Sequence, residues 1–385
     1  MNGIKHLSEA DYQEISLMDQ FAFQFELTTE EMSQSGERIK DHNILAWMVE
    51  GKIAAKVHII PLTTYIAGKL FKMGGIGAVA TWPEYRRQGI MKNLLFESLK
   101  EMKQAGQTVS FLSPFSFPFY RKYGWELTFT NKKYHIPMEY FKRDWQAKGY
   151  LKRVKADVTL LDEIYQNFAK KYTGTLDREP KWWEQNILSD AKQIAVAYSE
   201  AGDPEGYLIY QVKNNTYTVK DFAYTNRNGR QLLLEFISNH DASVYHVDIT
   251  VPENDQLALL LTEPTFEEKI NHYFMARIVD VPAFFKEYPF DTNENQTPVA
   301  IEVEDSFFTD NSGVYQLSAS DATRIEAETS DIQVTIQMLT MIMLGYKRPL
   351  ELFELGLIQG EREAIEQLET YIPTQQTYIA PADHF

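Results

Sequence analysis

The sequence predicts a mixed α/β fold of two similar domains followed by a smaller α+β domain. An order of three strands, a helix and a strand occurs twice, near residues 45–112 and near 193–250. A linker-like segment, 282–296, follows, and strands and helices then alternate over about 90 residues. A chain of 385 residues also exceeds what one hydrophobic core usually supports. We expect domains over residues 1–145, 146–285 and 286–385.

The first unit begins with helices over residues 6–33, where apolar side chains are interleaved with acids and amides. Three strands are predicted within 44–82, because β-favouring apolar runs alternate there with glycine-containing turns. From residue 90 to 106 the apolar spacing becomes helical, and Gly106 is a typical stop. A strand over 108–112, an aromatic-rich loop, a short helix and a further strand complete the unit.

The second unit opens with a region, 145–190, that we expect to be helical. The strands that follow it are predicted at 193–199, 206–212, 216–224 and 243–251, with a helix at 230–240 between the last two.

The third unit is predicted to contain strands over 300–308, 313–319 and 322–328 and helices over 331–345 and 361–372. The apolar run Val334–Tyr346 in the first of these helices could line a lipid pocket or form core, and we favour core.

Composition narrows the possible functions. The net charge of -16 argues against nucleic acid, which selects basic surfaces. The absence of cysteine excludes disulfides, thiolate metal ligands and a cysteine nucleophile, and no metal site is expected. The polar, acidic start and the lack of an apolar run of about 20 residues predict a cytoplasmic protein that does not bind membranes.

The segment Glu84–Leu95, "EYRRQGIMKNLL", predicts an anion site. It places Gly89 between a strand and a helix, where the first-turn N–H groups lack intrahelical partners and the helix dipole is positive. Arg86 and Arg87 add positive charge. A phosphate or pyrophosphate would suit this site, whereas a solvated basic helix start is the alternative.

Three phosphate-binding patterns can be compared with this segment. The G-x-x-x-x-G-K-[ST] loop is absent. The glycines of Gly75–Ala80 look like a dinucleotide fingerprint, but they precede a strand-like run instead of opening a helix. Arg86–Met91 resembles the [Q/R]-x-x-G-x-[G/A] pyrophosphate loop of the GNAT acetyltransferases, with Met91 in place of the usual small residue.

A second motif supports the same resemblance. Phe119–Glu126, "FYRKYGWE", resembles the F-Y-x-x-x-G-F segment of GNAT enzymes and follows Gly89 at the expected spacing. The whole chain resembles the Eis-like N-acetyltransferases, which implies a GNAT domain, a degenerate GNAT-like domain and a sterol-carrier-like domain. The resemblance covers the chain in architecture, but its motifs are specific only around 73–126 and at the C-terminus. It also implies a homohexamer.

The resemblance implies that acetyl-CoA binds between two splayed strands, Gly77–Trp82 and Thr108–Ser113, with its pantetheine arm paired like an added strand. Phe115 and Ser116 would lie beside the cofactor. Backbone groups of the first strand would bind the acetyl carbonyl and pantetheine, and the loop amides and arginines would bind the pyrophosphate. These residues are Val79, Ala80 and Thr81, followed by Arg86, Arg87, Gln88, Gly89, Ile90, Met91 and Lys92.

The resemblance also implies two catalytic groups. Tyr120 matches the family's proton donor to the leaving thiolate, whereas Tyr123 fits packing better. The C-terminal carboxylate of Phe385 would accept the amine proton, directly or through water. The alternatives are a core aromatic for Tyr120 and a frayed end for Phe385. The histidines at 58, 135 and 246 lie in strand-like runs and are expected in core or surface roles, and His384 is a neighbour of the terminus.

The acceptor is expected to be the primary amine of a small molecule or peptide, such as a polyamine, an aminoglycoside or a lysine side chain. Phe21, Phe25, Glu26 and Asp383 are candidate contacts, with ordinary helix and tail residues as the alternative. Because cysteine is absent, transfer would be direct. A lipid or small-molecule binding protein with a vestigial acetyltransferase domain is the second hypothesis.

Overall fold

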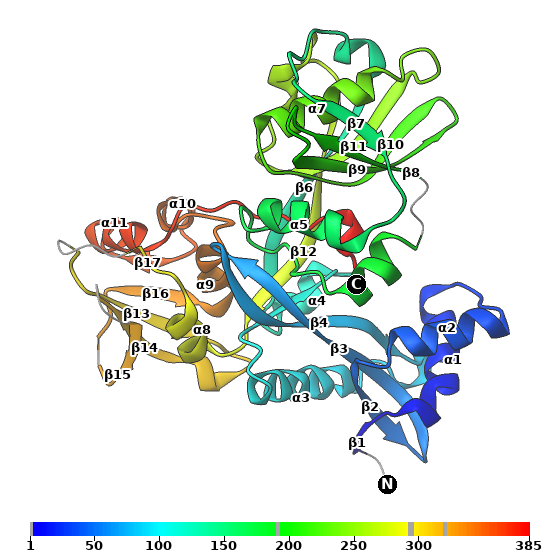
Figure 1. Cartoon of the computed structure of the whole chain (residues 1–385). Helices are drawn as coiled ribbons and strands as arrows, with labels where there is room; N and C mark the ends of the chain where they lie inside the picture. The colour runs from blue at the N-terminus through cyan, green and yellow to red at the C-terminus, as the bar shows by residue number, and fades with distance from the viewer. Residues whose placement is uncertain (1–2, 190–192, 292–295, 319–321, 328) are drawn as a thin grey trace.

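A computed structural model describes residues 3–189, 193–291, 296–318, 322–327 and 329–385. Three units surround a common centre (Figure 1). The first lies at the lower right of this view, the second above it and the third to the left, and the C-terminus ends at the junction between the first two. The mixed α/β class predicted from the sequence is confirmed.

The first unit has the predicted strand–strand–strand–helix–strand order. It also begins with a strand that the sequence did not predict, β1, which pairs antiparallel with β2. Its elements are β1 (Gly3–His6), α1 (Tyr12–Phe23), α2 (Thr29–Arg38), β2 (Asn43–Val49), β3 (Lys52–Ile66), β4 (Lys69–Thr81), α3 (Ile90–Gln104), β5 (Val109–Leu112), α4 (Phe117–Arg121) and β6 (Glu126–Pro137).

The second unit repeats that order. The expectation of helix throughout 145–190 is partly wrong, because Tyr150–Arg153 forms an edge strand paired with β8. The elements are β7 (Tyr150–Arg153), α5 (Val158–Ala169), α6 (Pro180–Trp182) with a π-helical turn (Trp183–Ile187), β8 (Gln193–Tyr198), β9 (Pro204–Lys213), β10 (Thr216–Tyr224), α7 (Arg227–Ser238), β11 (His246–Pro252) and β12 (Glu267–Ile278).

The two units exchange their last strands. In the 12-stranded sheet the order is β1-β2-β3-β4-β5-β12-β6-β11-β10-β9-β8-β7. Strand β5 of the first unit pairs with β12 of the second, and β11 of the second pairs with β6 of the first. The two exchanged strands pair antiparallel with each other at the centre. The half of this sheet that belongs to each unit is therefore incomplete without a strand from the other unit.

The third unit is a five-stranded sheet, ordered β15-β14-β13-β16-β17, covered by helices. Its elements are α8 (Val281–Glu287), β13 (Val299–Glu304), β14 (Gly313–Leu317), β15 (Ala322–Ile325), β16 (Ile332–Thr335), α9 (Ile336–Met343), α10 (Pro349–Glu354), β17 (Gln359–Gly360) and α11 (Arg362–Tyr371).

Two sequence predictions for this unit need correction. The segment predicted as a linker from Pro282 begins as helix α8, because Asp280 caps its first turn and Pro282 suits that position. The helix predicted from Asp331 begins as strand β16, which pairs parallel with β13. The apolar run Val334–Tyr346 packs into the hydrophobic cluster shared with the first unit, as the core interpretation expected.

A buried arginine joins the three units. Arg277 on β12 donates to the backbone oxygen of Tyr123 in the first unit. Its guanidinium pairs at 2.5 Å with Asp305 of the third unit, and both side chains are fully buried. Among the described residues, no helix combines the length and the apolar character needed to cross a membrane.

Candidate active site

Strand β4 separates from its parallel neighbour β5 after a short paired stretch. The two strands pair from Met73–Val109 to Ile76–Leu112 and no further. Beyond this point β4 has a bulge, where Ala78 takes a φ of 45° and the register with β3 shifts. The backbone from Val79 to Thr81 is thereby left without a parallel partner, as the splayed-strand prediction requires.

A cavity of about 610 Å³ lies at this opening. The residues predicted to hold the cofactor line it, except Gln88 and Ser116. Phe23 of α1, Phe119 of α4 and Tyr123 just after α4 also contribute, and the sequence had not assigned them to this site. The lining residues that were predicted are Val79, Ala80, Thr81, Arg86, Arg87, Gly89, Ile90, Met91, Lys92 and Phe115.

The loop before α3 has the conformation of an anion site. Gly89, the N-cap of α3, has a φ of 77°, and Arg87 has a φ of 64°. The backbone N–H groups of the first turn of α3 lie at the end of the helix that borders the cavity, and they have no acceptor within the helix. The side chain of Gln88 donates to the backbone oxygen of Glu84 at 3.1 Å, so only its backbone remains for a ligand.

Tyr120 is almost fully buried in α4 and lines neither of the two large cavities. Its ring packs edge-on against Phe119 and Phe115, with centroid distances of 5.0 and 5.4 Å, and both of these phenylalanines line the cavity. Burial raises the pKa of Tyr120, so its hydroxyl keeps its proton at neutral pH. Tyr123 packs on Phe307 at 4.9 Å, consistent with the packing role expected for it.

The C-terminal tail is held by the second unit. The backbone of Thr173 bonds to Gln376 and Tyr378, and the segment that follows Thr173 pairs with the end of β3. Asn131 of β6 donates to the backbone oxygen of Ile379 at 3.0 Å. Hydrogen bonds to both GNAT units therefore hold the tail, and it is not frayed.

Asp383 fixes the last residues of the tail. Arg178 donates to its two carboxylate oxygens at 2.8 and 3.0 Å and to those of Asp221 at 2.7 and 3.1 Å. Trp182 adds an indole N–H at 3.0 Å. Burial alone would lower the pKa of Arg178, but the two carboxylates raise it well above its usual value. Asp383 is thus an anchor and not the acceptor contact the sequence suggested.

Phe385 lies in a cradle made by two glycines of β4. A methyl group at Gly75 would lie 2.7 Å from the Phe385 ring, and one at Gly77 would lie 3.9 Å from its carboxyl carbon. The ring also packs edge-on against Phe274 at 5.1 Å and Trp182 at 6.4 Å. The glycines that resemble a dinucleotide fingerprint in the sequence therefore make room for the terminus.

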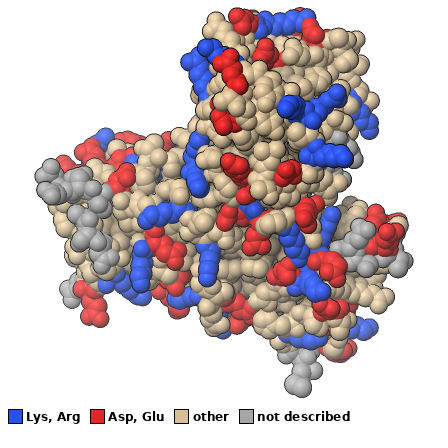
Figure 2. Space-filling model, viewed as in Figure 1, with Lys and Arg blue, Asp and Glu red and all other residues tan. Residues whose placement is uncertain are grey.

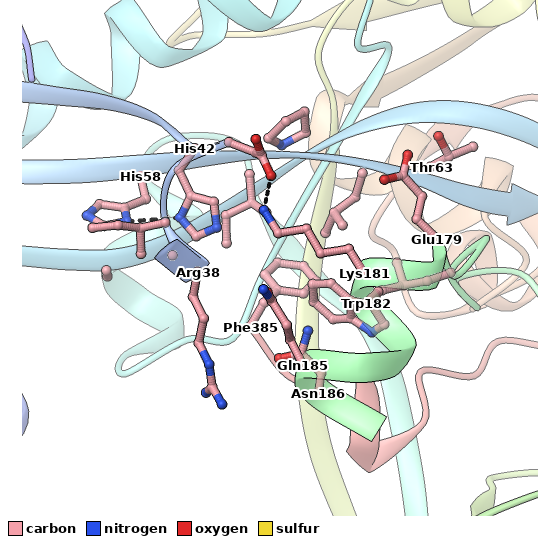
Figure 3. Close-up of a pocket in the computed structure, with 18 of the residues that line it drawn as sticks. Arg38, His42, His58, Thr63, Glu179, Lys181, Trp182, Gln185, Asn186 and Phe385 are labelled. Atoms are coloured by element: carbon pink, nitrogen blue, oxygen red, sulfur yellow. Dashed lines mark hydrogen bonds and ion pairs between the residues drawn. The ribbon is translucent and has the colours of Figure 1, made fainter. Parts of the chain in front are cut away.

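A second cavity, of about 600 Å³, contains the Phe385 terminus. Ala78 lines this cavity and its neighbour Val79 lines the first, so both cavities border the β4 bulge. Trp182 of α6 lies beside Phe385, whereas the Lys181 side chain extends towards His42 (Figure 3). Phe21, Phe25 and Glu26 are not among its lining residues, so those candidate acceptor contacts are not brought together here.

The charges of the second cavity are mixed. Asp19, Asp41, Asp177 and Glu179 line it together with basic residues, and Lys181 pairs with Asp41. The basic side chains are Arg38, Lys72 and Lys181. On the face shown in Figure 2, Lys and Arg are likewise interspersed with Asp and Glu. The residues that line the second cavity therefore carry both signs of charge.

The second unit has a much smaller opening at the equivalent position. Strands β10 and β11 pair only from Thr216 to Thr218, which leaves the same kind of splay. The space beyond it is filled by aromatic and leucine side chains, and the remaining cavity is about 30 Å³. Arg230 and Asp255 form an ion pair at its edge. This small opening fits the degenerate GNAT-like domain that the resemblance implies for the second unit.

Comparison with protein-family models identifies all three units. Residues 3–128 match an acetyltransferase (GNAT) domain, residues 174–278 match another acetyltransferase (GNAT) domain, and residues 281–380 match a sterol carrier protein domain. The predicted order of domains is therefore confirmed.

Known proteins resemble the chain over most of its length. An uncharacterized N-acetyltransferase of Streptomyces avermitilis is 21% identical, with 78% of each chain covered. The crystal structure of a probable N-acyltransferase of Enterococcus faecalis V583 is 28% identical over 100% of both chains, with a TM-score of 0.92. Eis1 from Mycobacterium abscessus is 20% identical over 100% of both chains, with a TM-score of 0.85, which establishes a shared fold.

The glycine cradle predicts that Gly75→Ala releases the terminus. The added methyl would overlap the Phe385 ring, and overpacking of this kind costs about 1–3 kcal/mol, or roughly tenfold in the population of a displaced tail. We expect carboxypeptidase to remove Phe385 about ten times faster than in the wild type. Gly3→Ala is the matched control, because a methyl group there has no neighbour within 4 Å. Equal trimming rates in all three proteins would contradict the cradle.

The Arg178 cluster predicts a large loss of stability in Arg178→Leu. Two buried carboxylates would lose their partner, which costs about 3–5 kcal/mol in the free energy of unfolding. Urea unfolding followed by tryptophan fluorescence measures the change. Arg362→Leu is the control, because it removes only exposed ion pairs, whose attraction water screens. Similar losses in the two variants would show that Arg178 is not a structural anchor.

Proposed function

Because the chain belongs to the GNAT acetyltransferases and combines two GNAT domains with a sterol carrier protein domain, we propose that it transfers acetyl from acetyl-CoA directly to a primary amine. The observation that carries this proposal is that two cavities border the β4 bulge. One cavity has the helix start and splayed strand that suit acetyl-CoA, and Phe385, whose carboxyl carbon lies near Gly77, lines the other.

Acetyl-CoA would occupy the cavity between β4 and α3. Its pantetheine arm would pair with the free backbone of Val79–Thr81, as an added strand does. The pyrophosphate would lie against the first-turn amides of α3, with Arg86 and Arg87 supplying charge. No metal is needed for this binding, because helix amides and arginines neutralise the phosphates.

The amine would enter the second cavity and attack the thioester carbonyl at the bulge. Phe385, as the last residue, would present its α-carboxylate beside Gly77 to accept the amine proton, directly or through water. Tyr120 would donate a proton to the departing thiolate, and its buried hydroxyl is protonated at neutral pH. The acetyl group thus moves from sulfur to nitrogen, one proton leaves the amine and one reaches the sulfur.

The acceptor would carry an anionic as well as a cationic group. Two cavity cations, Arg38 and Lys72, accompany the carboxylates of Asp177 and Glu179. A peptide or amino-acid-like amine fits this mixture better than a polyamine with only positive charges. Lipid binding by the third unit has less support, because Val334–Tyr346 packs into the core.

A turnover screen tests the proposed function. Wild-type protein is incubated with acetyl-CoA and aminoglycosides, polyamines, amino acids or lysine peptides, and CoA release is measured. Turnover with at least one amine is expected. Calorimetry that detects no acetyl-CoA binding, combined with no CoA release from any mixture, would reject the proposal.

Tyr120→Phe is expected to lower kcat by about 100-fold or more, because it removes the hydroxyl that protonates the thiolate. The calorimetric Kd for acetyl-CoA should stay within about twofold of the wild type, since the proton is donated in the transition state and not when the cofactor binds. Tyr245→Phe, an exposed tyrosine of the second unit, is the control. A wild-type kcat in Tyr120→Phe would remove the donor role.

Addition of Gly-Ser after Phe385 is expected to lower kcat by about 100-fold, because the carboxylate becomes an amide and the chain end moves. The same two residues placed before Met1 are the control. The acetyl-CoA Kd is measured for both proteins. Full activity of the extended chain would show that the α-carboxylate is not the proton acceptor.

A further inference from the structure

A row of titratable side chains borders the acceptor cavity and has no part in the chemistry above. Lys56 and His58 on β3 are fully buried, and the Nζ atom of Lys56 lies 3.0 Å from Nε2 of His58. Nδ1 of His58 lies 3.2 Å from Nδ1 of His42. Asp19 of α1 pairs with Lys56 at 2.7 Å. These four residues form a continuous chain of hydrogen-bond distances.

The chemistry of the partners fixes where the protons lie when Lys56 is charged. Its ammonium has three N–H donors, and three acceptors surround it: Asp19, the backbone oxygen of Ala78 and Nε2 of His58. His58 then carries its proton on Nδ1 and donates it to Nδ1 of His42. His42 in turn carries its proton on Nε2. The hydrogen bond made by one residue thus decides which ring nitrogen of the next histidine carries the proton.

The row begins at the cavity and ends at the β4 bulge. His58 is directly opposite Gly77 in the register of β3 and β4, so it lies on the face where the Phe385 carboxyl group is found. His42 and His58 both line the cavity, and His42 is on the side of Lys181 and Phe385 (Figure 3). Lys56 does not line it and instead bonds to Ala78 at the β4 bulge, which both cavities border.

We propose that His42, His58 and Lys56 form a proton relay that removes from the acceptor cavity the proton released by the attacking amine. This inference rests on the proposed amine acetylation and adds to it a destination for the proton. The carboxylate of Phe385 alone is a poor final acceptor, because an α-carboxyl group has a pKa near 3.5 whereas an alkyl ammonium has one near 10.

The relay passes one proton to Lys56 and leaves both histidines uncharged. Before transfer Lys56 is a neutral amine. His42 carries its proton on Nδ1 and has a free lone pair on Nε2, whereas His58 carries its proton on Nε2. A proton arriving from the cavity binds this Nε2. The Nδ1 proton of His42 moves to Nδ1 of His58, and the Nε2 proton of His58 moves to the lone pair of Lys56. The product is the ammonium that pairs with Asp19, and the reverse sequence resets the chain after release of the products.

Burial of His42 and His58 keeps both rings uncharged, which suits the passage of a proton through them. Burial lowers the pKa of His42 to about 4, and burial with the Lys56 charge lowers the pKa of His58 well below its usual value. Both rings are therefore uncharged at neutral pH. Burial also lowers the pKa of Lys56, with Asp19 opposing it, so a neutral amine becomes accessible. The other charged groups near His42 are Asp41 and Lys181, which pair with each other.

The test measures kcat for His42→Gln and His58→Gln with a series of primary amines of decreasing pKa. Glutamine can keep a hydrogen bond but cannot pass a proton on. With an amine of pKa near 10 at pH 7, kcat should fall about tenfold or more, and the loss should disappear at high pH or with a weakly basic amine. His246→Gln, on β11 and outside both large cavities, is the control and should behave as wild type.

A structural role would lower kcat equally for all amines and at every pH, and that result would overturn the relay. So would unchanged kcat in both variants. If the variants do not fold, the wild-type proton inventory in H₂O–D₂O mixtures decides: several protons in transit give a curved plot, and a straight line contradicts the relay. Absence of any amine turnover by the wild type would reject the proposed function and the relay together, whereas wild-type turnover with uniform variant losses rejects the relay alone.

Discussion

The buried guanidinium of Arg178 is the interaction on which the site depends. A charge with no exposed surface is tolerated only when it is fully paired, and Arg178 is paired on both sides by Asp221 and Asp383. Asp221 belongs to β10 of the second unit, whereas Asp383 belongs to the tail. The same pair that neutralises Arg178 therefore fixes the tail two residues from its end, and the ring of Phe385 follows into the space beside β4.

This arrangement gives the second GNAT unit a part in the candidate site. Its own splayed strands are filled by side chains, yet its Trp182 and Lys181 line the second cavity and its Arg178 anchors the tail. The first unit supplies the opposite wall through β3 and β4. The second cavity is thus lined by residues of both GNAT units and by the tail, whereas the first cavity is lined by the first unit.

Local sequence was enough to predict most of the residues that line the first cavity. The basic loop before Ile90, the strand that precedes it and Tyr120 are close together in the chain, and each has a local signal in residue type and spacing. The acceptor side depends on contacts between residues far apart. Arg178 and Asp383 are 205 positions apart, and nothing in their neighbourhoods marks them as a pair. His58 and Lys56 looked like ordinary strand residues because their partners, His42 and Asp19, lie on other elements.

The sequence predicted elements whose apolar residues have a clear period, and it missed strands that form only because they pair with a distant strand. Helix α3 has a clear apolar face, whereas β7 and β12 become strands because a neighbouring strand supplies their hydrogen bonds. Gly75 and Gly77 show that contacts between distant residues also limited the prediction of the site. Their spacing suggested a nucleotide loop, but the reason for their small size is an aromatic ring from the other end of the chain.

The strand exchange affects how the chain folds during its synthesis. During synthesis β5 emerges long before its partner β12, and β6 must wait for β11. The first unit therefore has an open, apolar strand edge until most of the second has left the ribosome, which is a hazard for association between nascent chains. Closing these distant pairings also slows folding, since the entropy of a long loop is lost before its contacts form. Such a chain gains from synthesis at low local concentration and from chaperones that cover the edge.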